Sequence, residues 1–394
     1  MKRLFIEPID VLMFRSERPF TAREAHVART GTISHLSFEG AIKSKIFIEF
    51  CKRKGYLPED FQRNGNRNES LNDFNETKNK LIEFVKQKMK NDEELKNLLE
   101  VIGYTPLEFP SKLNVLGVFF AKKGEFVEHF PIPNDVVKED KENGKIVKLQ
   151  PRECFQFKWL NGNISIGMAV YSQLKRVEGL MNFKDLINYL NGGYPEPARI
   201  RYKGKELNKP YFKEIRSGIE LEKERKKTVE GALYTAEFIR LIENWGFIVW
   251  YEAPNGFSIE GALRLGGEGK GAISQQIEDK KMNWGSLIEK INENKKFKLY
   301  LATPSYFDGC MPPEANLEKV LGVKLKLISA FPGKPIYIGG YDFALNREKP
   351  LRRWVNAGAV YYYKFDGEIK SDLILPIKIV DKNIDMRCAF IGRW

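Results

Sequence analysis

The sequence predicts an α+β protein built on antiparallel sheets. Short strand-like runs alternate irregularly with a few helical segments, and several runs are joined through hairpin signals. Two split βαβ units would use about this inventory of elements. The chain has 394 residues, enough for two domains of ordinary size, each with its own core.

The composition favours a polyanionic partner. The chain has 65 basic against 52 acidic residues, a formal net charge of +13 and a pI of about 9.3. Such a surplus points to nucleic acid above all, although a Lys-rich surface that is merely well solvated has the same composition. With 42% apolar residues the chain is globular rather than disordered.

Cysteine and histidine usage argues against a metal centre. The four cysteines lie far apart without a CxxC pair, and there are three histidines, so we expect no metal and no cofactor. The N-terminal segment has neither the pattern of a signal peptide nor that of an anchor, and no run of about 18 apolar residues suggests a membrane helix. The expected location is the cytoplasm.

The chain begins with a strand-like run that leads into a basic segment. Residues 4–14 are apolar with Pro8 interrupting them, which suits an edge strand or a bulge. A turn closed by Pro19 follows, and residues 21–32 are polar, either a helix or an ordered loop. Arg15 and Arg18 flank this turn, and Arg23, His26 and Arg29 follow at intervals of three residues, so that a helix would place these three on one face.

A helix with an insertion after it comes next. Ser37 is the expected cap, an apolar stripe at helical spacing follows, and Gly55 is the expected end. Lys43 lies off that stripe and is a further candidate RNA contact. Residues 64–79 are rich in Asn and charge and predict a mobile insertion, within an inserted region of about 56–110; residues 83–100 predict an exposed helix.

The best domain boundary lies near residue 195. From residue 112 the pattern is β, with a hairpin signal at Lys123–Gly124. A glycine pair at 192–193 and prolines at 195 and 197 then interrupt the chain. We therefore predict domains over residues 1–195 and 196–394.

The second half contains two basic stretches. Residues 199–227 hold eleven Lys or Arg against five Glu, interleaved with Tyr202, Tyr211 and Phe212. This mixture suits single-stranded RNA, because charge follows the backbone and rings stack on bases; a solvated hairpin face is the alternative. Further strands follow, and Arg347, Lys349, Arg352 and Arg353 predict a basic loop between two of them.

The densest glycine cluster lies at residues 263–274, LRLGGEGKGAIS, and the segment at residues 258–264 is a candidate short helix. Glycine permits positive φ and close approach, and successive exposed N–H groups form a nest that suits phosphate. The segment does not fit the P-loop template, because Arg264 stands where Gly is required and Gly271 stands where Ser or Thr is required. The sequence therefore argues against a nucleotide-hydrolysing loop. A tight turn explains it equally well. The candidate contacts are Gly266, Gly267, Gly269, Lys270 and Gly271.

Three stretches together resemble one family. FIEPIDVLMFRSERPF with the following SFEGAIKSKIF resembles the opening of the third RAMP subunit of the type III-B CRISPR effector, the Cmr complex. The central segment and the glycine loop of that family resemble RSGIELEKERKKTVEGALYTAEFIRL followed by RLGGEGKGA. Its C-terminal strand–loop–strand resembles SAFPGKPIYIGGYDFALNREKPLRRWVNAGAVYYYKF. One departure is the end of the chain, where CAFIGRW keeps only Gly392 of a second glycine-rich turn.

The resemblance implies two ferredoxin-like, RRM-like domains and no catalytic activity. It implies a subunit that caps the foot of the effector and holds the repeat-derived 5′ handle of the crRNA. It also implies that this subunit bridges the large polymerase-like subunit to the backbone RAMP subunit. The RNA-facing parts would be the glycine loop and the stretch from Arg15 to Arg29, whose candidate RNA contacts are Arg15, Arg18, Arg23, His26 and Arg29.

Two other functions stay open from the residues. Some RAMP relatives cleave crRNA precursors without metal, and His26, flanked by Arg23 and Arg29, is the candidate base for such an endoribonuclease. The other is a scaffold that contacts protein alone, for which Trp354 and Trp394 are the best interface candidates. Salt sensitivity of RNA retention separates an RNA binder from a scaffold.

Overall fold

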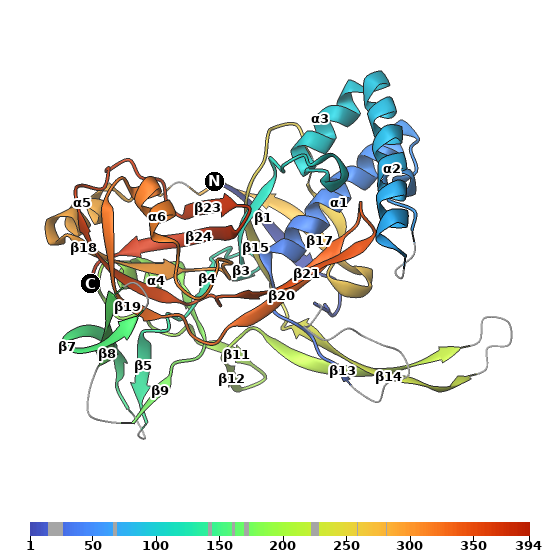
Figure 1. The fold of residues 1–394 in the computed structure, drawn as a ribbon. Coiled ribbons are helices and arrows are strands. Elements are labelled where there is room, and N and C mark those ends of the chain that lie inside the picture. The colour runs from blue at the N-terminus through green and yellow to red at the C-terminus, as the bar shows by residue number, and fades with distance from the viewer. Residues whose placement is uncertain are drawn as a thin grey trace.

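Two antiparallel sheets form the framework of the protein (Figure 1). The computed structural model describes residues 1–14, 27–65, 69–140, 144–159, 162–168, 173–221, 228–257, 259–280 and 282–394. The predicted α+β class with antiparallel sheets is confirmed.

The first sheet has seven strands in the order β10-β4-β3-β15-β1-β17-β16. Their bounds are β1 Lys2–Pro8, β3 Asn114–Lys122, β4 His129–Pro131, β10 Leu180–Asn182, β15 Trp245–Glu252, β16 Gly261–Leu265 and β17 Lys270–Ile277. Helix α1 (His35–Lys54) belongs to the connection from β1 to β3, which run parallel with β15 between them. This is a split βαβ unit. From β15 to β17 the described residues contain strand β16 instead of a second helix.

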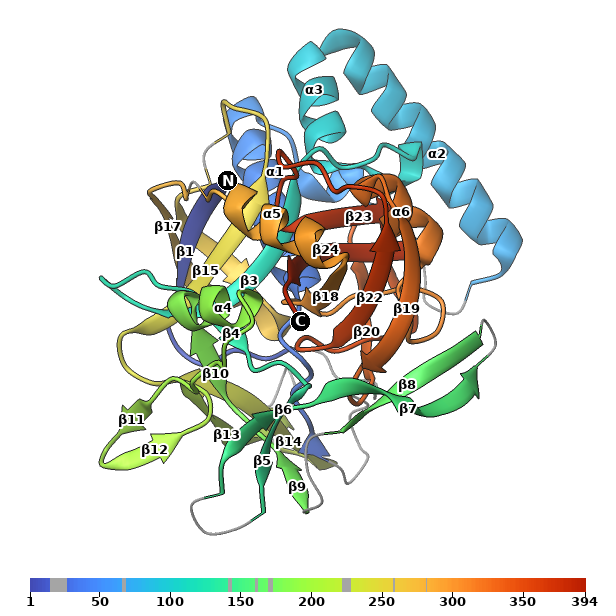
Figure 2. The ribbon, with the colours of Figure 1, turned by 90° about the vertical axis from the view of Figure 1, so that its left-hand side faces the viewer.

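The second sheet repeats this plan with five strands in the order β19-β22-β18-β24-β23. Their bounds are β18 Lys296–Leu301, β19 Lys324–Phe331, β22 Val360–Asp366, β23 Ile377–Asp381 and β24 Ile384–Gly392. Helix α6 (Glu314–Leu321) connects β18 to β19, with β22 between these two parallel strands, and α5 (Gly285–Asn294) precedes β18 (Figure 2). The connection from β22 to β24 contains β23 and no helix.

The predicted boundary near residue 195 does not separate the two sheets. The first sheet takes strands from both sides of it, and the chain changes sheet only between β17 and β18. The reason is strand β15, whose residues are almost all buried, so that it needs neighbours on both edges and lies between β1 and β3. The Gly and Pro cluster ends helix α4 (Phe183–Leu190) and marks a connection within one structure.

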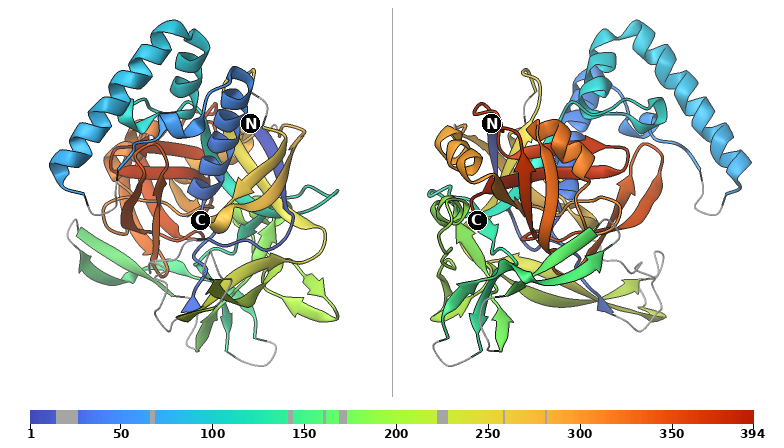
Figure 3. Two further views of the ribbon diagram at one scale, coloured as in Figure 1. Left: turned by 90° about the vertical axis from the view of Figure 1, so that its right-hand side faces the viewer. Right: turned by 60° about the vertical axis from the view of Figure 1, so that its left-hand side comes forward.

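The inserted region forms a helical lobe beside the sheets (Figure 3). Helix α1 begins after Ser34, whose side chain accepts from the Leu36 N–H, rather than after the expected Ser37, and it ends as predicted at Gly55 with φ of 71°. The prediction of a mobile Asn-rich segment over 64–79 is wrong for its second part. Ser70 caps helix α2 (Leu71–Asn91), and α3 (Glu93–Ile102) follows. Short 3₁₀ turns lie at Pro58–Phe61 and Thr105–Leu107.

The remaining strands form ribbons and small sheets. They are β2 Val27–Ala28, β5 Val136–Glu139, β6 Ile146–Lys148, β7 Gln150–Trp159, β8 Gly162–Met168, β9 Leu174–Arg176, β11 Ile200–Tyr202, β12 Lys205–Leu207, β13 Tyr211–Leu221, β14 Thr228–Leu241, β20 Ile336–Asp342 and β21 Arg347–Trp354. Two of the resulting hairpins, β13–β14 and β20–β21, extend away from the second sheet toward the side of α1 (Figure 1). No helix among the described residues is long and apolar enough to span a bilayer.

A buried polar cluster helps to join the part of the protein around the first sheet to the second sheet. The hydroxyls of Tyr189 and Tyr362 donate to the Asp135 carboxylate at 2.8 and 2.5 Å, and the Lys298 ammonium donates to the Tyr189 carbonyl at 2.8 Å. Burial lowers the pKa of Lys298 to about 7, against the attraction of Asp135. Aromatic contacts such as Trp250 with Phe390, 6.4 Å between centroids, continue the same core from one sheet into the other.

Candidate nucleic-acid interface

The glycine cluster forms the tip of the β16–β17 hairpin at the edge of the first sheet. The expected short helix before it is wrong, because residues 261–265 form strand β16, which pairs with β17 from Gly261↔Ser274 to Leu265↔Lys270. Gly266 has φ of 76°, Gly269 has φ of 57°, and a 3₁₀ turn spans Gly267–Gly269. The tip is exposed at Gly266, Glu268 and Gly269.

Close packing explains why two of these positions are glycine. The Gly267 N–H donates to the Met13 carbonyl at 2.6 Å, and a Cβ on Gly266 would lie 2.3 Å from that oxygen. A Cβ on Gly271 would meet Ile9 at 3.0 Å, and the Gly271 carbonyl accepts from the Ile9 N–H. Gly267 itself tolerates a side chain, since its Cβ would stay 3.5 Å from the nearest atom and its φ is ordinary.

These contacts bring the glycine hairpin next to the segment that leads into the predicted Arg15–Arg29 stretch. Leu12 exchanges two backbone hydrogen bonds with Ile239 of β14, and the Gly31 N–H donates to the Phe14 carbonyl at 2.8 Å. Both ends of the stretch are therefore held beside the hairpin. Arg29 is exposed. The candidates Arg15, Arg18, Arg23 and His26 lie outside the described residues.

Lys270 is a partly available cation at this tip. Its ammonium lies 3.3 Å from the Glu268 carboxylate and 5.1 Å from the centroid of the Phe238 ring. Its side chain is 27% exposed and its Glu268 partner 43% exposed. An exposed ion pair of this kind contributes little stability, so an incoming phosphate can replace the carboxylate at small cost.

The nearby cations of the β13–β14 ribbon are paired with acids. Arg240 and Arg216 share both Glu214 and Asp10, with Arg240 at 2.9 Å and Arg216 at 3.1 Å from Asp10. Hydrogen bonds, first from Arg240 and then from Arg216, lower the pKa of Glu214 to about 2. Sequence reasoning missed Asp10 and Arg240, because the two residues are 230 positions apart and no local pattern joins them.

Lys43 lies apart from the glycine hairpin. It pairs with Glu39 at 2.6 Å, and Glu39 also accepts from Arg387 of β24 and from the Val115 N–H. Burial lowers the pKa of Lys43, Glu39 opposes that shift, and the positive charges of Arg387 and Lys349 add to it. Residues two apart lie on nearly opposite sides of a helix, and it is Lys45 that reaches β16, 3.3 Å from the Ala262 carbonyl.

The predicted basic loop over residues 347–353 is a strand instead. β21 pairs with β20 in a separate ribbon, with Tyr337 opposite Arg353 and Ile338 opposite Arg352. Residues Arg347 through Arg353 are all exposed. The expectation for Trp354 as an interface anchor is wrong, since Trp354 is 5% exposed and packs on His35 and Tyr306.

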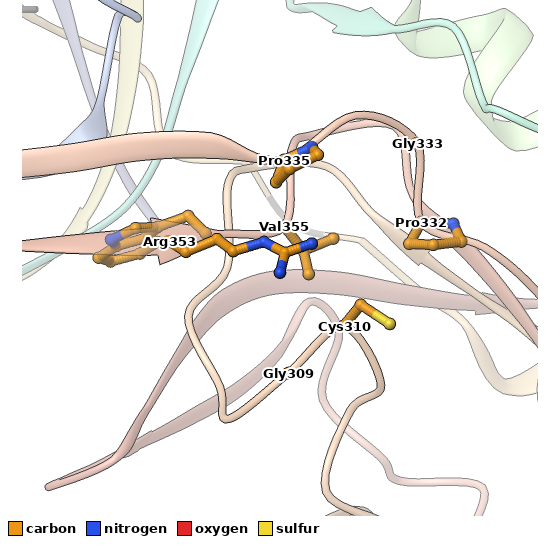
Figure 4. A pocket seen from close by; sticks show the side chains of 8 residues that line it. Gly309, Cys310, Pro332, Gly333, Pro335, Arg353 and Val355 are labelled. Carbon is orange, nitrogen blue, oxygen red and sulfur yellow. The ribbon is translucent and has the colours of Figure 1, made fainter. Parts of the chain in front are cut away.

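The structure contains a small cavity at the base of this ribbon. Gly309, Cys310, Pro332, Gly333, Pro335, Arg353, Trp354 and Val355 line it (Figure 4). Its volume of about 20 Å³ has room for one water molecule but for no substrate. Among the described residues no group of three or more His, Cys, Asp or Glu is arranged to hold a metal ion.

Comparisons with known proteins place these features in a family. The family model described as CRISPR-associated protein (Cas_Cmr3) matches residues 4–375. A chain of the type III-B Cmr-β complex bound to cognate target RNA and AMPPnP is similar with a TM-score of 0.44 and 16% identity, over 91% of this chain and 86% of that one. A chain of the Csm3–Csm4 subcomplex of the type III-A interference complex gives 0.36 and 14%, over 100% and 99%.

No curated protein matches the chain. The family model, by contrast, covers nearly the whole sequence and confirms the resemblance carried by the three motifs. The chain therefore belongs to the Cas_Cmr3 family of CRISPR-associated proteins, the third RAMP subunit of the type III-B Cmr effector.

Proposed function

We propose that this subunit is a non-catalytic RNA-binding protein that holds the 5′ handle of the crRNA. In the same proposal it bridges the large polymerase-like subunit and the backbone RAMP subunit. The observation that carries the first part is the adjacency of two candidate regions far apart in sequence. The Gly267 N–H meets the Met13 carbonyl, so the glycine hairpin lies beside the start of the Arg15–Arg29 stretch.

The chemistry of the tip suits a phosphate backbone. An exposed turn with a left-handed residue presents main-chain N–H groups at close range, as phosphate-binding nests do. Lys270 supplies a cation whose present partner is exposed. Arg29 is an exposed cation at the other end of the stretch. Phosphate contacts from such groups make binding fall steeply with salt.

The first test introduces negative charge at the tip. Gly267→Asp together with Lys270→Glu keeps the backbone geometry, because Gly267 has room for a Cβ. In the co-expressed effector we expect crosslinks from this subunit to the 5′ handle to disappear and guide RNA retention to become more sensitive to salt. The measurement is crosslinking with both the peptide and the nucleotide mapped.

Gly267→Ala with Lys270→Gln is the matched control. It adds the same Cβ without negative charge, and we expect the handle crosslinks to weaken without being lost. If the charged variant holds its guide as well as the parent does, the handle-binding proposal is wrong. If this subunit crosslinks to protein alone, it acts as a scaffold and not as an RNA-binding subunit.

A further inference from the structure

A buried network of charged side chains joins helix α1 to strand β24 of the second sheet. The Arg387 guanidinium donates to both oxygens of the Asp385 carboxylate, at 2.7 and 2.9 Å, and it also donates to Glu39 of α1. The same guanidinium donates to the Val115 carbonyl of β3 at 3.1 Å. Arg387 is 6% exposed and Glu39 is 8% exposed, so solvent screens this pair far less than a surface pair. One arginine of the second sheet therefore contacts both α1 and the first sheet.

His35 extends the network to the first residue of α1. Its Nε2 atom is buried 3.6 Å from Oδ1 of Asp385, and its ring packs on that of Trp354 with 5.8 Å between centroids. Burial raises the pKa of Asp385, but its contacts with His35 and Arg387 outweigh this effect and lower the pKa to about 2. A negative charge therefore stays beside the N-terminal end of α1, where the helix dipole favours it.

The start of α1 follows closely on the predicted Arg15–Arg29 stretch. Residues 30–34 alone lie between Arg29 and His35 along the chain. The last of them, Ser34, is 2% exposed and caps the helix with its side chain. A displacement of the helix start would therefore act on a short connection that leads directly to Arg29.

This connection is also attached at its other end. The Thr30 N–H donates to the Glu237 carboxylate of β14 at 3.3 Å, and the Gly31 N–H donates to the Phe14 carbonyl at 2.8 Å. Two hydrogen bonds are a weak attachment by themselves, because each one replaces a hydrogen bond to water. The position of the connection therefore depends on the helix start as well.

We propose that Arg387 is a positioning residue for the handle site. From the second sheet it fixes the start of α1, and with it the end of the stretch that carries Arg29. The inference rests on the proposed handle binding and deepens it, because it gives a buried residue outside the RNA-facing surface a role in that binding. Coupling between two sites is reciprocal, so RNA bound along the stretch should in turn hold α1 and β24 together more firmly.

The first measurement is amide hydrogen exchange in the full-length chain. Arg387→Met removes the donors that hold the helix start, and we expect the amides of residues 29–38 to exchange at least tenfold faster. Lys298→Met is the matched control. It also removes a buried cation of the second sheet, but that cation lies beside Tyr189 and attracts Asp135. In this control, residues 29–38 should exchange at the parental rate.

Arg387→Lys repeats the measurement with a milder change. It keeps the positive charge but replaces the planar fork by a single ammonium, so we expect an intermediate exchange rate. Urea unfolding establishes that each variant is folded. Equal acceleration in Lys298→Met and Arg387→Met would overturn the proposal, because a general loss of stability would then explain it. Parental exchange in both Arg387 variants would overturn it as well.

A second measurement separates positioning from direct contact with RNA. Dissociation constants for a fluorescein-labelled oligouridine that lacks any handle sequence are measured over a series of salt concentrations. Each phosphate contact to single-stranded RNA contributes about 0.7 to the salt slope, the slope of log K against log salt. We expect Arg387→Met to keep the parental slope, because Arg387 is buried. A slope smaller by about 0.7 would show that Arg387 itself binds phosphate and would contradict the positioning role.

Crosslinking in the co-expressed effector distinguishes this proposal from handle binding itself. We expect Arg387→Met to weaken handle crosslinks from peptides that contain Arg29 about tenfold, and those from the glycine hairpin less. If the parent crosslinks to the handle and Arg387→Met does so equally well, handle binding is correct and the positioning role is wrong. If the parent shows no handle crosslinks, handle binding is wrong, and the positioning role fails with it.

Discussion

The two ribbons β13–β14 and β20–β21 are both rich in basic residues, but they differ in whether those residues form ion pairs with acids. On β13–β14, Lys213 pairs with Glu237 at 3.0 Å, and Arg216 and Arg240 share Glu214 and Asp10. On β20–β21 the four described cations have no such partners. A count of basic residues along a sequence therefore does not predict where positive charge remains available on the surface.

The largest expected effect is on stability, and it differs between the buried arginine that holds the tip of β20–β21 and an exposed arginine of β13–β14. Arg63 is 2% exposed, pairs with Glu69 at 2.5 Å and holds the tip of β20–β21. Arg63→Ala leaves that carboxylate and the Leu345 carbonyl without their partner, so we expect a loss of about 3–5 kcal/mol of unfolding free energy. Arg216→Ala on β13–β14 removes a 38% exposed pair and should cost under about 1 kcal/mol. Urea unfolding of both variants measures this, and equal losses would contradict it.

An intermediate effect is expected when the acids of β13–β14 are neutralised. Asp10→Asn with Glu214→Gln should free Arg216 and Arg240 and steepen the salt slope for oligouridine by about 1.4, at ~0.7 for each freed cation. Glu318→Gln, which frees Lys324 near α6, is the control and should leave the slope unchanged. An unchanged slope in the double variant would mean that pairing is not what keeps this ribbon from binding.

The smallest effect is a pH dependence confined to β13–β14. The pKa of Glu214 is lowered from 4.5 to about 2 when folded, so its stabilising contribution is present above about pH 4.5 and is lost as the pH falls to about 2. Glu214→Gln should therefore lose less stability than the parent between pH 5 and about pH 3. The difference should be small, because solvent screens a 26% exposed carboxylate.

Lys349→Gln on β20–β21 is the comparison for this measurement. This substitution removes no ion pair, so the urea midpoint of the variant should match that of the parent at pH 5 and at about pH 3. Identical behaviour of Glu214→Gln and the parent would show that the shared pairs of β13–β14 do not contribute to stability in solution.

Local chemistry predicted several elements correctly. Gly55 ends α1 because only a residue that tolerates positive φ closes a helix in that way, and the apolar stripe of α1 is buried at Phe38, Ile42 and Ile46. The α+β class followed from strand periodicity. The glycine cluster was correctly singled out as a turn of unusual backbone, although its flanking strand β16 was expected to be helical.

Other predictions failed where distant residues decide the structure. The basic segment 347–353 is a strand because β20 pairs with it and Trp354 anchors it, which hydropathy does not reveal. The boundary near residue 195 missed the return of the chain into the first sheet through β15. The sequence of the inserted region, about residues 56–110, gave no sign that Arg63 would be buried and would donate to the Leu345 carbonyl, 282 residues away.

Residue types and local patterns along the chain were enough to establish the fold class, the family through its three motifs, and the presence of a glycine turn and basic stretches. These properties depend on residue type and on near neighbours along the chain. Which cations are neutralised by acids, and which candidate residues lie next to one another, depends on how distant segments pack together. Ion pairing depends on distances of a few ångströms between residues such as Asp10 and Arg240, and those distances are set by the packing of the sheets and ribbons.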